Sequence, residues 1–301
     1  MTGVIHCERV TKVFGSFQAV QDLDLVAEPG EVIGYLGPNG AGKSTTIRML
    51  MGLTRPTGGT VHLLGQNPAE VPAVRAQVGY CPGELRLDDR LTIRETLETW
   101  SMLRGGVDRA LMTDLIERFD IDPGKVVHSL STGNRRKVGL VGAFMVRPDV
   151  LILDEPTNGL DPLMQRAFVE TLGEAVWEGA TVLLSSHVLS EVERLATRLV
   201  ILRQGKVVAE GSVASFRDQA QQIVESVVGR APDIAELNSL AGASDVEIDG
   251  DMLRLAWRGP MDGLIQVLSR CQVQKMRIHE PDLERSFMDY YRNDSNDGGG
   301  K

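Results

Sequence analysis

The chain has 301 residues, of which 42% are hydrophobic and 24% charged, and its formal net charge is −9 at pH 7. This composition is typical of a soluble globular protein with one large domain and a smaller one. The negative charge argues against a nucleic-acid-binding surface and against direct docking on anionic lipid, so any membrane contact is expected to pass through another protein.

The lengths of the apolar runs and the number of cysteines indicate in which cellular compartment the protein is expected. The longest apolar run, residues 138–146, is half the ~18 residues that a membrane span requires, so it is expected to form a buried helix. The first residues show no basic segment followed by an apolar one, so no secretory signal is expected. Cys7, Cys81 and Cys271 suit reduced core thiols, and the five histidines lack metal-ligand spacing. A cytoplasmic protein without a structural metal is predicted.

The first predicted strands lead into a glycine-rich loop. Extended segments are expected over residues 4–10, 23–26 and 32–36, with turn residues between them. Phe14 lies in the first of these turns. Its ring is placed either to stack on a nucleotide base or to pack beneath the turn, and both interpretations remain open.

Residues 37–45 fit the pattern G-x-x-x-x-G-K-[ST] at every fixed position. A strand precedes them and a helix follows, the context in which loop N–H groups and a helix N-terminus bind phosphate. Lys43 is then expected to reach the β- and γ-phosphates, and Ser44 to coordinate Mg²⁺. The alternative is a strand-turn-helix that is glycine-rich for packing. The predicted nucleotide-binding residues of this loop are Gly37, Pro38, Asn39, Gly40, Ala41, Gly42, Lys43, Ser44 and Thr45.

A helical insertion follows two further strands, predicted over 61–65 and 77–81. Apolar residues recur at three- and four-residue intervals over 91–103 and 110–119, which predicts helices. The insertion ends in Leu-Ser-Thr-Gly-Asn at residues 130–134. Ser131 is a natural N-cap for the helix that continues beyond it.

Two buried strands after the insertion end in chemically active side chains. Residues 150–153 are apolar and are closed by Asp154 and Glu155, a pattern typical of a parallel strand buried on both faces. Asp154 is expected to hold Mg²⁺, and Glu155 to orient and deprotonate a water molecule. His187 ends the next predicted strand, 181–187, at the same edge of the sheet, although a lone histidine is also commonly structural.

Alternating strands and helices predict an α/β fold with a mainly parallel sheet and ligands at its carboxyl edge. Helices are expected over 162–177 and 190–196, and a hairpin over 199–209. Beyond about Ser212 the order of elements changes to a small α+β unit that resembles a split βαβ arrangement. Its elements are expected at 222–228, 233–240, 245–248, 252–257, 261–270, 273–279 and 283–291.

The motif at residues 130–134 resembles the signature of ATP-binding-cassette (ABC) ATPases, commonly Leu-Ser-Gly-Gly-Gln. Residues 37–45 resemble the family's Walker A motif, 150–155 its Walker B motif, 158–161 its D-loop, and His187 its switch histidine. The resemblance covers residues 4 to about 211. It implies a P-loop NTPase core with an N-terminal antiparallel β subdomain, a helical subdomain at about 85–147 and a small ferredoxin-like C-terminal domain. The expected boundaries are 1–215 for the nucleotide-binding domain and 216–292 for the accessory domain. Residues 293–301 are polar and glycine-rich, so a disordered tail is expected there.

The resemblance also implies cofactors and roles. ATP and Mg²⁺ would bind between two copies of the chain, with Ser131 and Gly133 contacting the γ-phosphate held by the partner's Lys43 and Ser44. Glu155, His187 and Lys43 would be catalytic, Phe14 would stack on the base, and Asp161 would join the nucleotide site. The sequence departs from the family pattern in two places. In the signature, Thr132 replaces the first glycine and Asn134 replaces the glutamine. Gly83 stands where the family has a glutamine near Mg²⁺, so either Glu84 substitutes for it or the contact is absent.

The Leu-Ser-x-Gly-Asn form resembles the signature of multidrug and antibiotic exporter ATPases. The C-terminal appendage, including residues 280–287, resembles the tail of drug-exporter ATPases. Two copies of a separate membrane permease are the implied partner, docking on the helical insertion. Trp100 and Met102 lie there, and a core role for either is equally open. The expected function is ATP-driven efflux of drugs, lipids or other hydrophobic molecules from the inner face of the cell membrane, without nucleic acid. The alternatives are an importer ATPase and a soluble or regulatory cassette.

Overall fold

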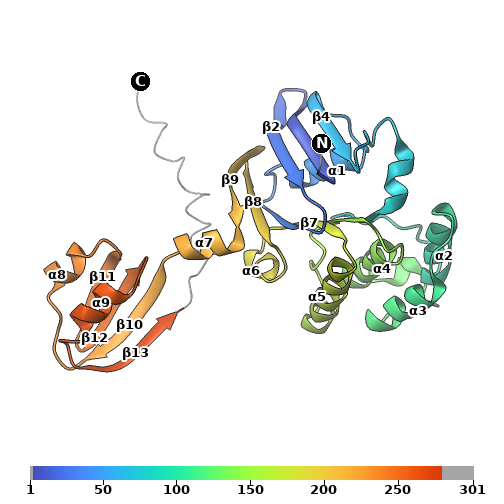
Figure 1. Cartoon of the computed structure of the whole chain (residues 1–301). Helices are drawn as coiled ribbons and strands as arrows, with labels where there is room; N and C mark the ends of the chain where they lie inside the picture. Colours follow the sequence, from blue (N-terminus) through green and yellow to red (C-terminus); the bar gives the residue numbers. More distant parts are fainter. Residues whose placement is uncertain (1–2, 280–301) are drawn as a thin grey trace. The chain divides into compact units, whose positions relative to one another are not determined.

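The computed structural model describes residues 3–279, and the chain divides into two compact units between Glu210 and Gly211. The first unit holds a three-stranded sheet of order β2-β1-β4 and a six-stranded sheet of order β5-β6-β7-β3-β8-β9 (Figure 1). The second unit holds a four-stranded sheet. These mixed layers, with an antiparallel subdomain beside a parallel core, confirm the predicted fold class.

The strands of the first unit are β1 (Ile5–Phe14), β2 (Phe17–Ala27), β3 (Val32–Leu36), β4 (Gly58–Leu63), β5 (Val78–Cys81), β6 (Val150–Asp154), β7 (Thr181–Ser186), β8 (Arg198–Arg203) and β9 (Lys206–Ser212). Both β1 and β2 extend beyond the predicted segments, because the hairpin tip pairs through its backbone while its side chains are exposed. Burial, reinforced by the charge of Asp24, raises the pKa of Cys7 on β1 to about 12.

The parallel strands carry the site. Every residue of β3, β6 and β7 is buried, as near-continuous apolar runs in a covered parallel sheet require. The register pairs Asp154 with Ser185 and Leu36 with Ser186. The carboxyl ends of β3, β6 and β7 therefore meet at one edge of the sheet.

The helical elements of the first unit are α1 (Lys43–Leu50), η1 (Pro72–Gln77), α2 (Ile93–Leu103), α3 (Arg109–Arg118), η2 (Val127–Ser129), α4 (Thr132–Phe144), α5 (Pro162–Trp177) and α6 (Leu189–Val192). Residues 136–144 of α4 are all buried, which confirms the predicted buried helix. Helix α6 ends earlier than the predicted 190–196. Thr197 N–H donates to the carbonyl of Val32 at 2.8 Å, so the backbone has already left the helix and begins to pair with β3. In the part of the chain described, no helix is long and apolar enough to cross a membrane.

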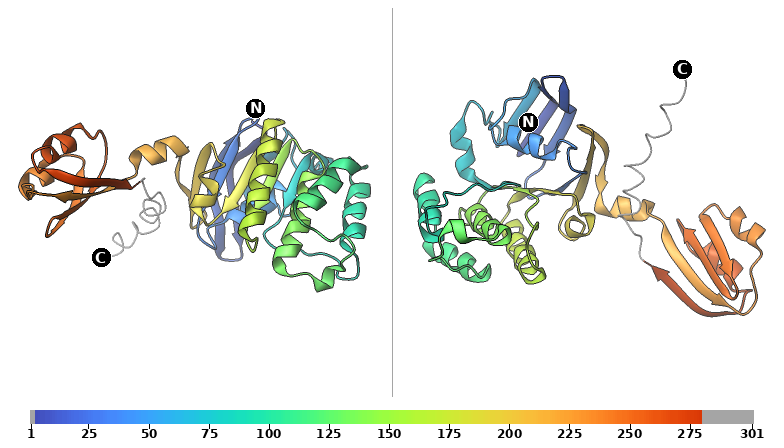
Figure 2. Two further views of the ribbon diagram at one scale, coloured as in Figure 1. Left: turned by 90° about the horizontal axis from the view of Figure 1, so that it is seen from below. Right: turned by 180° about the vertical axis from the view of Figure 1, so that it is seen from behind.

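The second unit has the succession β-α-β-β-α-β of a ferredoxin-like unit, preceded by a helix. Its antiparallel sheet has the order β11-β12-β10-β13, and α8 and α9 lie on one face of that sheet (Figure 2). The two helices supply Leu237, Leu264 and Leu268 to the apolar core of this unit. Its elements are α7 (Val213–Gln219), β10 (Gln222–Val228), α8 (Ile234–Ser239), β11 (Ala243–Asp249), β12 (Met252–Trp257), α9 (Asp262–Leu268) and β13 (Val273–His279).

Helix α7 was not predicted from the sequence. Ser212 caps it by accepting a hydrogen bond from Ser215 N–H at 3.0 Å, directly where β9 ends. Strand and helix share this one residue, so the sequence shows no separating turn. The predicted helix 283–291 and tail 293–301 lie outside the described residues.

Candidate nucleotide site

The loop between β3 and α1 adopts a conformation that requires glycine. Gly40 and Gly42 have φ angles of +82° and +106°, and a Cβ on Gly42 would lie 2.6 Å from the carbonyl oxygen of Ala19. Helix α1 begins immediately afterwards at Lys43. The loop N–H groups and the helix N-terminus thus form the setting in which backbone dipoles bind an anion.

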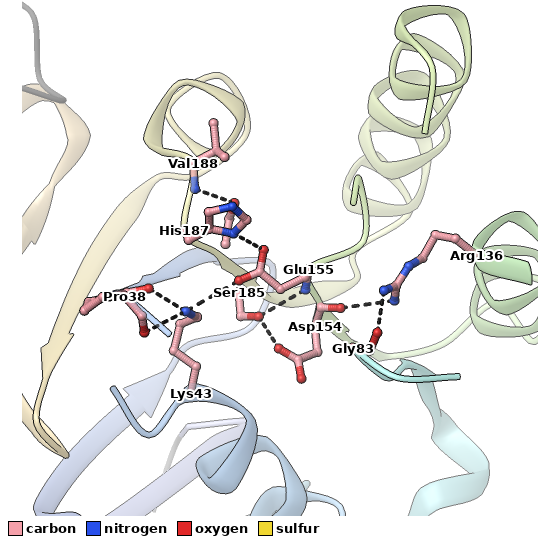
Figure 3. Close-up of polar contacts among 11 residues, drawn as sticks. Pro38, Lys43, Gly83, Arg136, Asp154, Glu155, Ser185, His187 and Val188 are labelled. Atoms are coloured by element: carbon pink, nitrogen blue, oxygen red, sulfur yellow. Dashed lines mark hydrogen bonds and ion pairs between the residues drawn. The ribbon is translucent and has the colours of Figure 1, made fainter. Parts of the chain in front are cut away.

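The ammonium group of Lys43 is buried between the phosphate loop and Glu155. Its side chain is only 6% exposed, and Nζ donates to the carbonyl oxygens of Gly37 at 2.5 Å and Pro38 at 3.3 Å. Nζ also lies 3.5 Å from Glu155 Oε1 (Figure 3). A cation this buried needs hydrogen-bond acceptors, and phosphate oxygens would replace those that it now uses.

Glu155 is held from two sides after the end of β6. His187 Nδ1 lies 2.7 Å from Glu155 Oε2, and because a carboxylate only accepts hydrogen bonds, Nδ1 carries the proton (Figure 3). The N–H of Glu155 donates to the carbonyl of Ser185 at 3.1 Å. Lys43, Glu155 and His187 therefore converge from three separate elements, as the common edge of parallel strands predicts.

Asp154 is 3% exposed, and its Oδ1 accepts a hydrogen bond from Ser185 Oγ at 2.5 Å. Its Oδ2 faces Gly83, where an added Cβ would lie 3.0 Å from that oxygen. Burial, and next the charge of Asp154, raise the pKa of Tyr80 to about 12. The carboxylate of Asp154 and the exposed hydroxyl of Ser44 at the start of α1 are the hard oxygen donors that suit Mg²⁺.

Phe14 lies away from this cluster on the β1–β2 hairpin. Its side chain is 51% exposed, and Lys12 Nζ lies 4.8 Å from the ring centroid. The ring is therefore not packed beneath its turn, and that alternative is wrong.

Glu84 is exposed, and within residues 3–279 its carboxylate makes no hydrogen bond or ion pair, so the structure does not bring it to Asp154.

The residues of the signature and D-loop motifs lie next to each other. Ser131 caps α4, with Oγ accepting from Asn134 N–H at 3.3 Å. A Cβ on Gly133 would lie 2.4 Å from the carbonyl of Gly159, so the first turn of α4 touches the D-loop through the backbone. Asp161 caps α5 by accepting from Leu163 and Met164 N–H, both at 3.0 Å. Over the described residues, no hydrogen bond or ion pair joins Ser131, Gly133 or Asp161 to Lys43 or Glu155.

Two residues of the site were not found from the sequence. Ser185 bonds both Asp154 and Glu155, and its place beside Asp154 on the adjacent strand was the signal that could have revealed it. Arg136 on α4 donates to the carbonyl of Asp154 at 3.3 Å. It stands among three consecutive basic residues, and only its helical spacing to the buried Leu140 marks it as inward-facing.

A phosphate loop with a buried lysine, facing carboxylates at the carboxyl edge of a parallel sheet, defines a P-loop nucleoside triphosphatase. The family model described as ABC transporter matches residues 20–158. The Nod factor export ATP-binding protein I of Paraburkholderia xenovorans (strain LB400) is 38% identical over 218 residues, which cover 70% of this chain and 72% of that protein. The chain belongs to the ABC transporter ATP-binding proteins, and it is an ATPase of that family.

Other relatives extend the match. The protein of the same name from Rhizobium etli is 34% identical over 289 residues, covering 93% of this chain and 90% of the relative. A solved ATP-binding subunit of an ABC transporter superposes with a TM-score of 0.67 at 33% identity, covering 72% of this chain and 92% of that structure. A dimeric bacterial ABC cassette gives a TM-score of 0.64 at 24% identity, covering 69% of this chain and 98% of the cassette.

Proposed function

We propose that this chain is the ATP-hydrolysing subunit of an exporter, acting as a homodimer on two copies of a separately encoded membrane permease. Its cargo would be a drug, lipid or other hydrophobic small molecule. The observation that carries the proposal is the placement of Glu155 between Lys43 and His187, in a chain whose relatives are named export ATP-binding proteins. The permease would hold the protein at the inner face of the cell membrane.

The loop of residues 37–45 would bind the phosphates of ATP, with Lys43 exchanging its loop carbonyls for phosphate oxygens. Ser44 and Asp154 would hold Mg²⁺, which neutralises phosphate charge when bound. Phe14 would stack on the base, since its ring is 51% exposed. ATP supplies the phosphoryl group that is transferred to water.

Glu155 would orient and deprotonate the attacking water. Its carboxylate is 17% exposed and is fixed through Oε2 by His187, so Oε1 remains the oxygen that faces Lys43 and the phosphate loop. Binding of phosphate by Lys43 would release Oε1 to accept a proton from water. His187 would thus act by holding the base in place.

Dimer formation would complete the site. Ser131 and Gly133 begin helix α4, whose N-terminus offers backbone N–H groups and a hydroxyl to the γ-phosphate bound by the partner's Lys43. Ser131 is exposed, as this contact requires. Asp161 lies on the loop that touches Gly133 through Gly159, and it would reach the nucleotide from the same interface.

A hollow on the first unit would receive a cytoplasmic helix of the permease. It has a volume of about 250 Å³ and lies between β5, α2 and α4. Trp100 forms one wall by packing on Gly142, and Leu103 at its rim is 80% exposed. Met102 is 72% exposed, so it is not a core residue. An apolar hollow with exposed apolar residues at its rim is typical of a docking site. Its lining residues are Tyr80, Pro82, Leu85, Trp100, Leu103, Arg104, Gly139 and Gly142.

The test is steady-state ATP hydrolysis by the wild type and Glu155→Gln, each alone and with the membrane protein that copurifies. We expect Glu155→Gln to lower kcat by ~10³-fold and to accumulate an ATP-bound dimer, because the base is lost while binding is kept. Glu170→Gln is the matched control, since that carboxylate is 57% exposed and pairs with Arg166 on the surface of helix α5. Absence of a copurifying permease would argue for a soluble cassette, and cargo uptake in vesicles would identify an importer.

A further inference from the structure

Arg136 is a buried cation that is neutralised by no carboxylate among the residues described. Its side chain lies on α4 and is 5% exposed. The guanidinium donates from Nη1 to the carbonyl of Pro82 at 2.5 Å and from Nη2 to the carbonyl of Gly83 at 2.5 Å. Nη1 also lies 3.3 Å from the carbonyl of Asp154 (Figure 3). Burying an unpaired guanidinium is costly, so its geometry is expected to serve a purpose.

Those three carbonyls lie at the carboxyl ends of two adjacent strands, β5 and β6. Pro82 and Gly83 follow β5, Asp154 ends β6, and the strands pair in parallel up to Cys81 and Leu153. Arg136 therefore ties the ends of both strands to the first turns of α4. A planar guanidinium with several fixed donors can bridge such a set, whereas an ammonium is a single point of charge.

The contact fixes the peptide that joins Asp154 to Glu155. Arg136 holds its carbonyl, and Ser185 accepts its N–H through the backbone oxygen at 3.1 Å and through Oγ at 3.2 Å. Glu155 has a φ of +51°, a left-handed conformation that is strained for a non-glycine residue and persists only where its surroundings impose it. Arg136 is one of the groups that impose it.

The same contact explains the glycine at position 83. Gly83 approaches the Asp154 carboxylate so closely that an added Cβ would lie 3.0 Å from Oδ2. Arg136 draws the backbone of Gly83 to this position. With no side chain at 83 to reach the site, the link between this segment and the carboxylates runs through Arg136.

We propose that Arg136 is a positioning residue for hydrolysis. It sets the Asp154–Glu155 peptide and transmits the position of the Ser131–Gly133 turn, on the same helix, to the carboxylates. The inference rests on the proposed roles of Asp154 and Glu155 in the ATPase site. It predicts that changes at Arg136 affect turnover and the Mg²⁺ requirement, and leave ATP binding in place.

The test uses the full chain with Arg136→Lys and Arg136→Gln. We expect kcat to fall ~10–100-fold and the Mg²⁺ concentration for half-maximal rate to rise, as for other residues that orient the ligands of a metal. The KM for ATP and the Kd of Mg²⁺-free ATP should stay at wild-type values. Arg135→Lys and Arg135→Gln are the matched controls, because that neighbour pairs with Asp89 at the surface.

Gly83→Ala tests the same link without removing the buried charge. We expect it to lower kcat, and the double variant with Arg136→Lys to be no worse than the more damaging single variant, because both disturb one contact. Wild-type kcat in Arg136→Lys, multiplicative losses in the double variant, or a parallel loss of ATP affinity and melting temperature would each overturn the proposal. Failure of the proposed function would appear differently, as a wild type whose ATP turnover no membrane protein influences.

Discussion

Glu155 shows how the site fixes a single residue. Its φ of +51° is unfavourable for a side chain with a Cβ, and its carboxylate is largely buried. Ser185, Arg136, His187 and Lys43 each hold a different part of the Asp154–Glu155 segment. A strained residue with this many fixed contacts is held in one position, as the proposed role of Glu155 as a base toward water requires.

His187→Ala should separate turnover from binding. Loss of the 2.7 Å contact with Glu155 frees the carboxylate to rotate, so kcat is expected to fall ~10–100-fold while the Kd of ATP is kept. The measurements are ATPase kinetics and nucleotide titration. His128→Ala is the control, because His128 is exposed on η2. Equal loss of activity in both variants would contradict the role assigned to His187.

Phe14→Ala should weaken nucleotide binding. Stacking of a base on an aromatic ring contributes ~1–3 kcal/mol, so the Kd of ATP is expected to rise roughly 5–150-fold. Phe17→Ala is the matched control, since Phe17 pairs with Phe14 across the same hairpin and is 62% exposed. If Phe17→Ala weakens binding more than Phe14→Ala, the stacking ring is the other one.

At the scale of elements, Arg198 joins three strands of the first unit. Its Nε donates to Glu31 Oε1 at 2.6 Å and Nη2 to Glu31 Oε2 at 3.0 Å, and Arg198 also bonds Glu210 on β9 and the carbonyl of Val26 on β2. Burial opposes ionisation of Glu31, but the hydrogen bonds from Arg198 outweigh it and hold its pKa below the usual value.

Arg198→Gln should therefore destabilise the fold by ~2 kcal/mol at pH 7, the size of a charge-assisted hydrogen-bond pair that is partly buried. Because the folded pKa of Glu31 is lowered, the stability it adds is complete above its ordinary pKa of 4.5 and is lost as pH falls through the folded pKa. The gap between wild type and variant in thermal unfolding should shrink below about pH 4. Arg166→Gln, which breaks a surface pair with a 79% exposed arginine, should cost under about 1 kcal/mol at any pH.

The bounds of a helix or strand could be predicted where its residue types give a clear signal for that element. Strand β10 was predicted at its observed bounds, because Ile223, Val224, Val227 and Val228 are β-branched and Gly229 follows directly after them. Helix α5 was also predicted at its observed bounds, and the structure shows Asp161 as its cap and Pro162 as its first residue. The exposed tip of β1–β2 and helix α7 were not, because backbone pairing and a shared cap residue leave no periodic signal in the side chains.

At the scale of the whole molecule, motif order was enough to predict that Lys43, Glu155 and His187 meet, since parallel strands bring their ends to one edge. Motif order could not predict Arg136 or Ser185, whose roles depend on which side of a helix or strand faces the edge. The two units also have separate apolar cores, each built from its own stretch of the chain. The core cluster of the first unit draws on residues from Ile5 to Leu202, and that of the second on residues from Val224 to Leu268.

Two cores built from separate stretches of chain predict two folding units. A chain ending at Glu210 should unfold cooperatively and bind ATP with the Kd of the full chain, because the phosphate loop and its supports all lie before that residue. Calorimetry of the full chain should show two transitions, one of which survives in the truncated form. A chain ending at Ala180 is the control, since it lacks β7, which stands between β6 and β3, and it should not fold. If the chain ending at Glu210 also fails to fold, the first unit depends on residues beyond its own core.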